Sequence, residues 1–155
     1  MTLSTPLPEH LTEPTRLGTE IVVTGKWVPS QPGGRFRTTE ESREMLREWE
    51  DIHLGARADG GVLSTEINHA VGEDAVLVHH VFEDAAAMVD YFGSTGTAHQ
   101  AALTEVAAPQ IHLVRGASVP EAARVAIEAK GVPVAFGEHI YGFTRQDYRR
   151  PDLDT

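Results

Sequence analysis

The chain contains no cysteine, so disulfide bridges and thiol catalysis are both excluded. It also has few basic residues, with 13 Lys and Arg side chains against 23 Asp and Glu and a formal net charge of −10. An acidic chain without a basic cluster is a poor partner for nucleic acid or an anionic membrane. No apolar run approaches the roughly 18 residues of a membrane helix, and the first residues do not resemble a signal peptide. We therefore expect a cytoplasmic protein with no nucleic-acid and no membrane partner.

The length of 155 residues, with 41% apolar and 23% charged side chains, is typical of one globular domain. Residues 1–18 contain three prolines and show no hydrophobic periodicity, which predicts a loose N-terminal arm. We place the single domain at residues 19–145 and a charged tail at residues 146–155.

The segment from Gly61 to Phe82 predicts a β-hairpin. Two runs of alternating or β-branched residues flank Gly72, which can adopt the positive φ that a two-residue loop requires. A loop there pairs Glu66 with His79 and, around them, Ser64 with Val81, Thr65 with His80, Ile67 with Val78 and Asn68 with Leu77. Side chains alternate across a strand, so one face is mostly apolar and holds Leu63, Thr65, Ile67, Val76, Val78, His80 and Phe82. We expect the other face, with Ser64, Glu66, Asn68 and His79, to line a ligand cavity; a one-residue slip would exchange the faces.

The rest of the chain predicts strands at residues 20–28, 110–115 and 132–143, and helices starting near Thr38, Asp84, Thr97 and Pro120. Thr38-x-x-Glu41 is a capping-box pattern, and apolar residues follow it at helical spacing as far as Ala56. The stretch from Gly93 to Thr97 predicts a break between two helices. The order β-α-β-β-α-β, followed by a helix and a strand, indicates the ferredoxin-like fold of the α+β class. Helices cover one face of such a sheet, so we expect the other face to pair with a second copy in a homodimer.

Four stretches resemble the antibiotic biosynthesis monooxygenase family: VHHVFED at 78–84, AAAMVDYF at 85–92, TGTAHQAAL at 95–103 and IHLVRG at 111–116. The resemblance covers residues 20–119. It implies a dimeric α+β barrel with a ligand cavity between each sheet and its own helices, and cofactor-independent oxygenation of aromatic, polyketide-type small molecules. His99 matches the histidine ligand of haem-degrading relatives. The tryptophan and the asparagine of those relatives are absent here. Tyr91 is the aromatic residue nearest to the tryptophan position, and the first strand has Thr24, Gly25 and Lys26 in place of the asparagine. We therefore expect no cofactor.

Oxygenation without a cofactor needs a base that removes a proton from the substrate inside a dry pocket. Histidine suits this role because its pKa lies near neutrality. We predict His79 as the base, Glu66 as the carboxylate that orients it and His99 as a contribution from the helical side. The predicted substrate-binding residues are Asn68 and Ser64, which would hydrogen-bond a substrate oxygen, together with Tyr91 and Trp27. If His79 is not the base, His80 and His112 are the next candidates.

Other interpretations stay open. Glu66 and His79 can be an ordinary cross-strand pair, and Trp27 and Tyr91 can be core aromatics. No H-x-H or HExxH spacing occurs, so we predict no metal site, with His112, His139, Glu138 and Glu66 as the alternative ligand set. The same base would also serve a cyclase or isomerase that uses no O₂, and such barrels include non-catalytic ligand-binding or dimerisation modules. The sequence does not identify the substrate.

Overall fold

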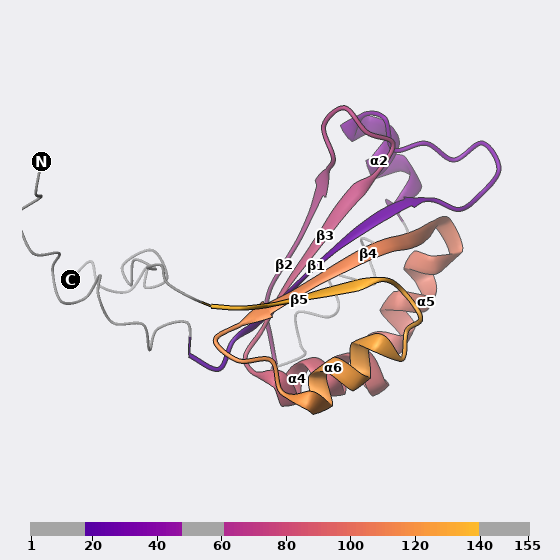
Figure 1. The fold of residues 1–155 in the computed structure, drawn as a ribbon. Coiled ribbons are helices and arrows are strands. Elements are labelled where there is room, and N and C mark those ends of the chain that lie inside the picture. The colour runs from indigo at the N-terminus through magenta and orange to yellow at the C-terminus, as the bar shows by residue number, and fades with distance from the viewer. Residues whose placement is uncertain (1–17, 48–60, 140–155) are drawn as a thin grey trace, which may run out of the picture.

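A five-stranded sheet carries helices against one of its faces (Figure 1). The computed structural model describes residues 18–47 and 61–139, and of residues 94–100 the backbone alone. The elements in chain order are β1 (Ile21–Pro29), α2 (Thr39–Met45), β2 (Val62–His69), β3 (Val76–Phe82), α4 (Ala85–Asp90), η3 (Tyr91–Thr95), α5 (Gly96–Val106), β4 (Ala107–Gly116), α6 (Glu121–Glu128) and β5 (Val134–Glu138). The element η3 is a π-helical turn.

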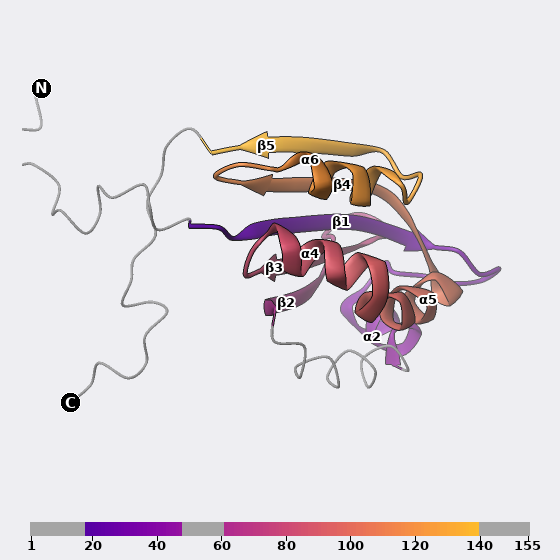
Figure 2. The same cartoon turned by 90° about the horizontal axis from the view of Figure 1, so that it is seen from below.

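The strand order is β2-β3-β1-β4-β5. β1 is antiparallel to both β3 and β4, β2 is antiparallel to β3, and the added β5 runs parallel to β4. This order confirms the predicted ferredoxin-like α+β fold with an added helix and strand. Seen from below, α4, α5 and α6 lie together on one side of the sheet (Figure 2).

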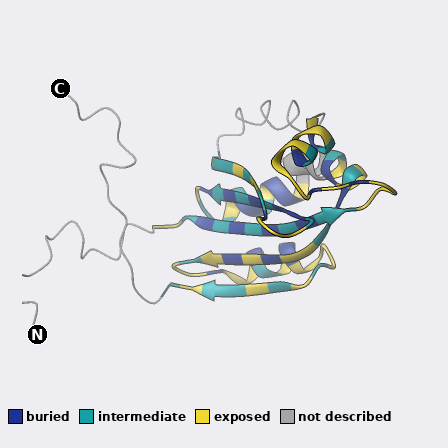
Figure 3. Ribbon diagram, turned by 90° about the horizontal axis from the view of Figure 1, so that it is seen from above, coloured by how far each residue is buried: buried dark blue, intermediate teal, exposed yellow. Residues whose placement is uncertain are grey.

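Alternation along β1 divides the sheet into a helix-covered face and an open face. The buried residues of β1 are Ile21, Val23, Gly25 and Trp27, and the half-buried residues between them are Val22, Thr24, Lys26 and Val28. On β3 the buried set is Val76, Val78, His80 and Phe82. Figure 3 shows this banding of buried and more exposed residues along the strands. We call the side of the buried set the covered face and the opposite side the open face.

The core between the covered face and the helices consists of two clusters. In the first, Met88, Phe92 and Ile127 pack from α4, η3 and α6 against sheet residues that include Ile21 and Phe82. In the second, Phe36, Leu46 and Leu103 pack around Trp27, Val76 and Val78. Phe36, α2 with its C-cap Leu46, and α5 therefore cover one end of the sheet, while α4 and α6 cover the other.

The predicted hairpin register is confirmed, since Glu66 pairs with His79 and Thr65 with His80. Gly72 has a φ of 82°, but the turn is not the predicted two-residue loop. The N–H of Glu73 donates to the carbonyl of Ala70 at 3.0 Å, so Gly72 is the third residue of a four-residue turn. The side chain of Asp74 binds outside the hairpin, where its carboxylate accepts the backbone N–H of Phe36.

The far end of the hairpin also differs from prediction. A register shift between Val62 and Ser64 places Val62 opposite Phe82. Val62 therefore packs against the core, and Leu63 is 53% exposed. A bulge changes which side chains point inward, so Leu63 does not belong to the apolar face where the alternation had placed it.

The predicted N-cap Thr38 is present, and the helix predicted to start near Asp84 is capped by Asp84 itself. The Thr38 hydroxyl accepts the N–H of Glu41 at 3.1 Å, and the Asp84 carboxylate accepts the N–H of Ala87 at 2.7 Å. The predicted break at Gly93–Thr97 is wrong, because the chain passes from α4 through η3 into α5 without leaving helical structure. A π-helical turn admits an extra residue within a helix, so Gly93 does not end it.

Several predictions concern residues outside the described ranges. They include the arm before residue 18, the helix beyond Arg47 with Trp49, the end of the last predicted strand, and the charged tail. Within the described residues, no helix is long and apolar enough to cross a membrane.

Removal of residues 120–155 is expected to aggregate or unfold the protein. Ala123 and Ile127 of α6 are fully buried in the first core cluster, and β5 covers the edge of β4, so the deletion exposes core and an unpaired strand edge. Size-exclusion chromatography and thermal unfolding followed by circular dichroism measure the outcome. Deletion of residues 146–155 is the control, because it leaves α6 and β5 intact. A soluble 1–119 chain with an unchanged melting temperature would contradict this expectation.

Candidate active site on the covered face

Two histidines lie in the core of the covered face. Together with Ser42, His80 and His112 are the buried polar side chains of the described residues. Buried polar groups are costly unless they are hydrogen-bonded, and they gather where a protein binds or transforms a ligand. The surroundings of these two rings therefore define the candidate site.

His80 is oriented by a threonine of the neighbouring strand. Its Nδ1 lies 3.0 Å from the Oγ1 of Thr65, the residue directly opposite on β2. When Nδ1 donates a proton to that oxygen, Nε2 carries the lone pair, and the ring has the tautomer of a general base. Thr65 thus supplies for His80 the orienting contact that had been predicted from Glu66 for His79.

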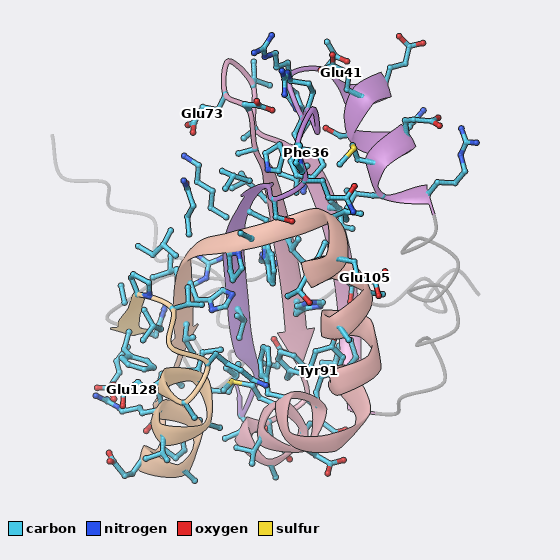
Figure 4. All side chains as sticks on the ribbon, turned by 90° about the vertical axis from the view of Figure 1, so that its right-hand side faces the viewer. Phe36, Glu41, Glu73, Tyr91, Glu105 and Glu128 are labelled. Atoms are coloured by element: carbon cyan, nitrogen blue, oxygen red, sulfur yellow. The ribbon has the colours of Figure 1, made fainter. Side chains whose placement is uncertain are left out.

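Aromatic side chains enclose His80. Its ring centroid lies 5.3 Å from that of Tyr91 and 5.7 Å from that of Phe82. Tyr91 is 4% exposed and comes from the first residue of η3, beside α5 (Figure 4). The π-helical turn that replaces the predicted break therefore carries Tyr91 into contact with the sheet. Such a wall excludes water from the imidazole.

Gly25 allows a second ring pair to come together on the same face. A Cβ atom on Gly25 would lie 2.7 Å from Nε1 of Trp27 and 3.1 Å from Nε2 of His112. The two ring centroids are 5.9 Å apart. A register shift contributes, because β1 steps from Lys26 opposite Ile111 to Trp27 opposite Pro109. Bulges of this kind often re-aim side chains beside sites.

His112 is held neutral. Burial lowers its pKa from the ordinary value of 6.5, and the nearby Lys130 ammonium lowers it further. Its Nδ1 is buried and has no hydrogen-bond partner among the described residues. A buried nitrogen without a partner costs about 1–3 kcal/mol, so packing alone is a poor reason for a histidine here.

The structure places His79 and Glu66 on the open face, away from the helices. They are opposite each other as predicted, but the expectation that their face bounds the cavity between sheet and helices is wrong. Nδ1 of His79 lies 3.0 Å from Oγ1 of Thr24, and Glu66 is exposed. Successive residues of a strand point to opposite faces, and the helices pack on the side of His80.

The other predicted site residues separate in the same way. Ser64 and Asn68 lie on the open face with Glu66, whereas Trp27 and Tyr91 lie on the covered face. The side chain of His99 is outside the described set, so its role stays a prediction.

Sequence reasoning missed Thr65, Thr24 and Gly25 as functional candidates. The correct register already placed Thr65 opposite His80, and that pairing was the available signal.

No group of three or more His, Asp or Glu side chains suited to a metal ion occurs in the described part of the chain. The alternative ligand set is dispersed: His112 is on the covered face of β4, Glu66 on the open face of β2, and Glu138 forms an ion pair with Arg124 at 3.1 Å.

No model of a known protein family matches the chain, and no curated protein matches it. Among solved structures, MupZ from Pseudomonas fluorescens is similar with a TM-score of 0.58 and 11% identity over 83% of this chain and 96% of MupZ. This likeness shows the fold.

Two further solved structures are similar over most of their own length. SnoaB, a cofactor-independent oxygenase from Streptomyces nogalater, has a TM-score of 0.44 and 15% identity over 62% of this chain and 90% of SnoaB. A putative antibiotic biosynthesis monooxygenase from Chloroflexus aurantiacus J-10-fl has a TM-score of 0.42 and 20% identity over 65% of this chain and 92% of its own.

We expect His112 to make the protein less stable in acid. Its pKa is lower in the folded than in the unfolded chain, so the unfolded chain binds more protons between the two pKa values. The contribution of neutral His112 is complete above pH 6.5 and is lost as the pH falls from 6.5 through the folded pKa. The melting temperature of the wild type should therefore fall more steeply over this range than that of His112→Gln. An NMR titration that gives His112 a pKa above 6.5 would contradict this.

Proposed function

We propose that the protein is a small-molecule enzyme that removes a proton from an activated carbon of its substrate and oxygenates that carbon without a resident cofactor. The observation that carries this proposal is His80, a buried imidazole with Nδ1 at 3.0 Å from a threonine hydroxyl and with aromatic rings around it. A histidine in this setting has two properties that favour a general base, a ring oriented by a hydrogen bond and a surrounding from which water is excluded.

The proposed substrate class rests on the aromatic side chains of the covered face. Tyr91, Phe82 and Trp27 are buried there, and aromatic rings favour flat or conjugated ligands. Conjugation also makes a C–H bond next to a carbonyl acidic enough for a histidine. An aromatic, polyketide-type ketone of the anthrone kind satisfies both conditions, and it is the substrate class that the family resemblance implies.

The chemistry balances with O₂ as the sole oxidant. His80 takes the proton of the activated carbon, and the resulting carbanion passes one electron to O₂. The two radicals combine into a carbon-bound peroxide, which takes up a proton. Loss of the second proton of the carbon and cleavage of the O–O bond then give a ketone and one molecule of water. The protein contributes proton transfer and water exclusion, typically about 10²–10⁴-fold for the base alone.

A rival proposal places the site on the open face, with His79 as base, Glu66 beside it and Ser64 and Asn68 near the substrate. Those residues would be enclosed only where a second copy covers the open face.

His99 would reach the substrate from α5 in the leading proposal. A cyclase or isomerase with the same base is distinguished by its lack of oxygen consumption.

The proposal includes a homodimer formed by two open faces. Ile111 and Leu113 of β4 are 44% and 40% exposed on this face, and no described helix covers it. The half-buried residues Val22, Val28, Leu77 and Val81 extend the apolar surface across β1 and β3. Two sheets that stack about 10 Å apart would remove these side chains from water.

His79 and His80 form a matched pair for testing the site, because adjacent residues sample the two faces. His80→Ala should lower oxygen uptake with anthrone by about 10²–10⁴-fold, the usual contribution of a general base. His79→Ala should stay close to the wild type. Thr65→Val should lose less, roughly 10-fold by loss of orientation, with a shifted pH profile. The readouts are an oxygen electrode and the absorbance of the ketone product.

Thermal unfolding of each variant separates loss of chemistry from loss of fold. If His79→Ala and Glu66→Gln lose activity while His80→Ala keeps it, the open-face site is correct. Product formation without oxygen uptake would indicate a cyclase or isomerase. Turnover that survives in both histidine variants would refute both sites.

Leu113→Glu should convert the dimer to a monomer, because it places a charge in the middle of an apolar sheet interface. Val125→Glu is the matched control, since Val125 is 55% exposed on α6 and lies away from the open face. Sedimentation velocity at micromolar concentration distinguishes the species. A wild type that sediments as a monomer would exclude the dimer.

A further inference from the structure

Lys130 connects the end of α6 to the π-helical turn η3. Although Lys130 is an exposed residue, its Nζ donates a hydrogen bond to the backbone carbonyl of Phe92 at 2.9 Å. The same ammonium lies over the ring of Phe92, 5.8 Å from the ring centroid. A hydrogen bond from a charged donor is stronger than one between neutral groups. Two contacts thus tie this one side chain to η3.

The backbone of Lys130 is fixed by the way α6 ends. Its N–H donates to the carbonyl of Ile127 at 3.1 Å, and the N–H of Gly131 donates to the carbonyl of Glu128 at 3.0 Å (Figure 4). Gly131 has a φ of 71°, the left-handed conformation in which helices commonly end. Ile127 is fully buried in the first core cluster. Lys130 therefore extends to η3 from a rigid position on the core.

Phe92 belongs to the aromatic cluster that encloses the proposed base. The ring centroids of Phe92 and Tyr91 are 5.4 Å apart in an edge-to-face arrangement, and Tyr91 lies 5.3 Å from His80. Phe82 contacts both ends of this cluster, at 5.8 Å from Phe92 and 5.7 Å from His80. Tyr91 and Phe92 are successive residues of η3, and π-helical turns are rare and often occur at functional sites. The conformation of this turn decides where both rings point, so a contact that stabilises the turn also positions Tyr91 on His80.

A second observation indicates that the ammonium faces the sheet. Burial lowers the pKa of His112, and the ammonium of Lys130 lowers it further. His112 lies on the covered face of β4 and is 6% exposed. A charge that extended into water would be screened from a buried ring. The side chain of Lys130 is therefore directed toward the covered face.

We propose that Lys130 is a positioning residue of the active site, which stabilises η3 so that Tyr91 stays packed on His80. The effect on turnover rests on the proposed function, whereas the effect on the position of Tyr91 does not. Without the ammonium, the carbonyl of Phe92 loses this hydrogen bond and the turn can adopt other conformations. Tyr91 would then move away from His80, and water would reach the imidazole. Water at the base returns a proton to the carbanion before O₂ reacts with it, so turnover falls.

Lys130→Met tests the role because it keeps the aliphatic stem and removes the ammonium. In the wild type, NMR should show NOE cross-peaks between the ring hydrogens of Tyr91 and His80, whose ring centroids are 5.3 Å apart. These cross-peaks should lose most of their intensity in Lys130→Met. The kcat with anthrone should fall roughly 10- to 100-fold, with a smaller change in KM. Lys130→Arg keeps a cation with N–H donors and should recover both the cross-peaks and kcat.

Arg124 is the matched control, because it makes the same two kinds of contact from α6 to another part of the protein. Its Nε donates to the carbonyl of Val119 at 2.9 Å, and its guanidinium lies 5.3 Å from the ring centroid of Phe136. Arg124→Met also removes one positive charge, and it breaks the ion pair with Glu138. This variant should lower the melting temperature at least as much as Lys130→Met does. It should leave the histidine–tyrosine cross-peaks and kcat unchanged, which a merely structural role of Lys130 would not predict.

The outcomes separate this inference from the proposed function. Cross-peaks that are lost in Lys130→Met and kept in Arg124→Met, in a protein that consumes no oxygen, support the positioning role and refute the oxygenase. Oxygen uptake that depends on His80, with cross-peaks and kcat unchanged in Lys130→Met, refutes the positioning role and leaves the base in place. Equal losses in Lys130→Met and Arg124→Met also refute it, as does a pKa of His112 that is the same in Lys130→Met and the wild type. If Lys130→Met does not fold, the wild type decides, because the absence of cross-peaks between the Lys130 side chain and the Phe92 ring refutes the inference.

Discussion

The rest of the structure depends on the position of β1 in the middle of the sheet. It is hydrogen-bonded on one side to β3 and on the other to β4, so each of its residues has neighbours on both flanks. Because side chains alternate along a strand, this single element decides which residues of three strands share a face. Ile21, Val23 and Trp27 are buried beneath helices, and this fixes the covered face for every paired residue. Gly25 is the one interruption of that buried row, and the rings of Trp27 and His112 occupy the space it leaves.

The same constraint explains why adjacent histidines have different surroundings. His79 and His80 each place Nδ1 at 3.0 Å from a threonine Oγ1, Thr24 for the former and Thr65 for the latter. Only the second pair lies among aromatic side chains, because the helices that carry Tyr91 and Phe92 pack on that side. The threonine contact is thus the same on the two faces, and burial makes the chemical difference. An imidazole acts as a more effective base where water is excluded and its tautomer is fixed.

The two faces allow two roles to coexist in one thin sheet. In the proposed enzyme, the covered face carries the base His80, while the open face presents the exposed side chains of Ile111 and Leu113 to a second copy. Strand β1 contributes to both, with Gly25 and Trp27 on one side and Val22 and Thr24 on the other. A dimer formed by two open faces would therefore be built on the same strand that borders the proposed site.

The sequence by itself determined the element order, the ferredoxin-like class and the register of the hairpin, because these follow from local features. The period-two pattern around Gly72 fixes the pairs, and Thr38 and Asp84 mark helix starts through their own side chains.

The sequence could not decide which hairpin face the helices would cover, since each face carries both apolar and polar residues. Nor did it reveal that η3 continues the helix, because a π-helical turn has no strong propensity signal. The convergence of Trp27 and His112 was equally beyond it, since residues 85 positions apart meet only through the pairing of β1 with β4 and its bulge. Tertiary packing made these choices, because the free energy of burying a face depends on side chains from distant segments.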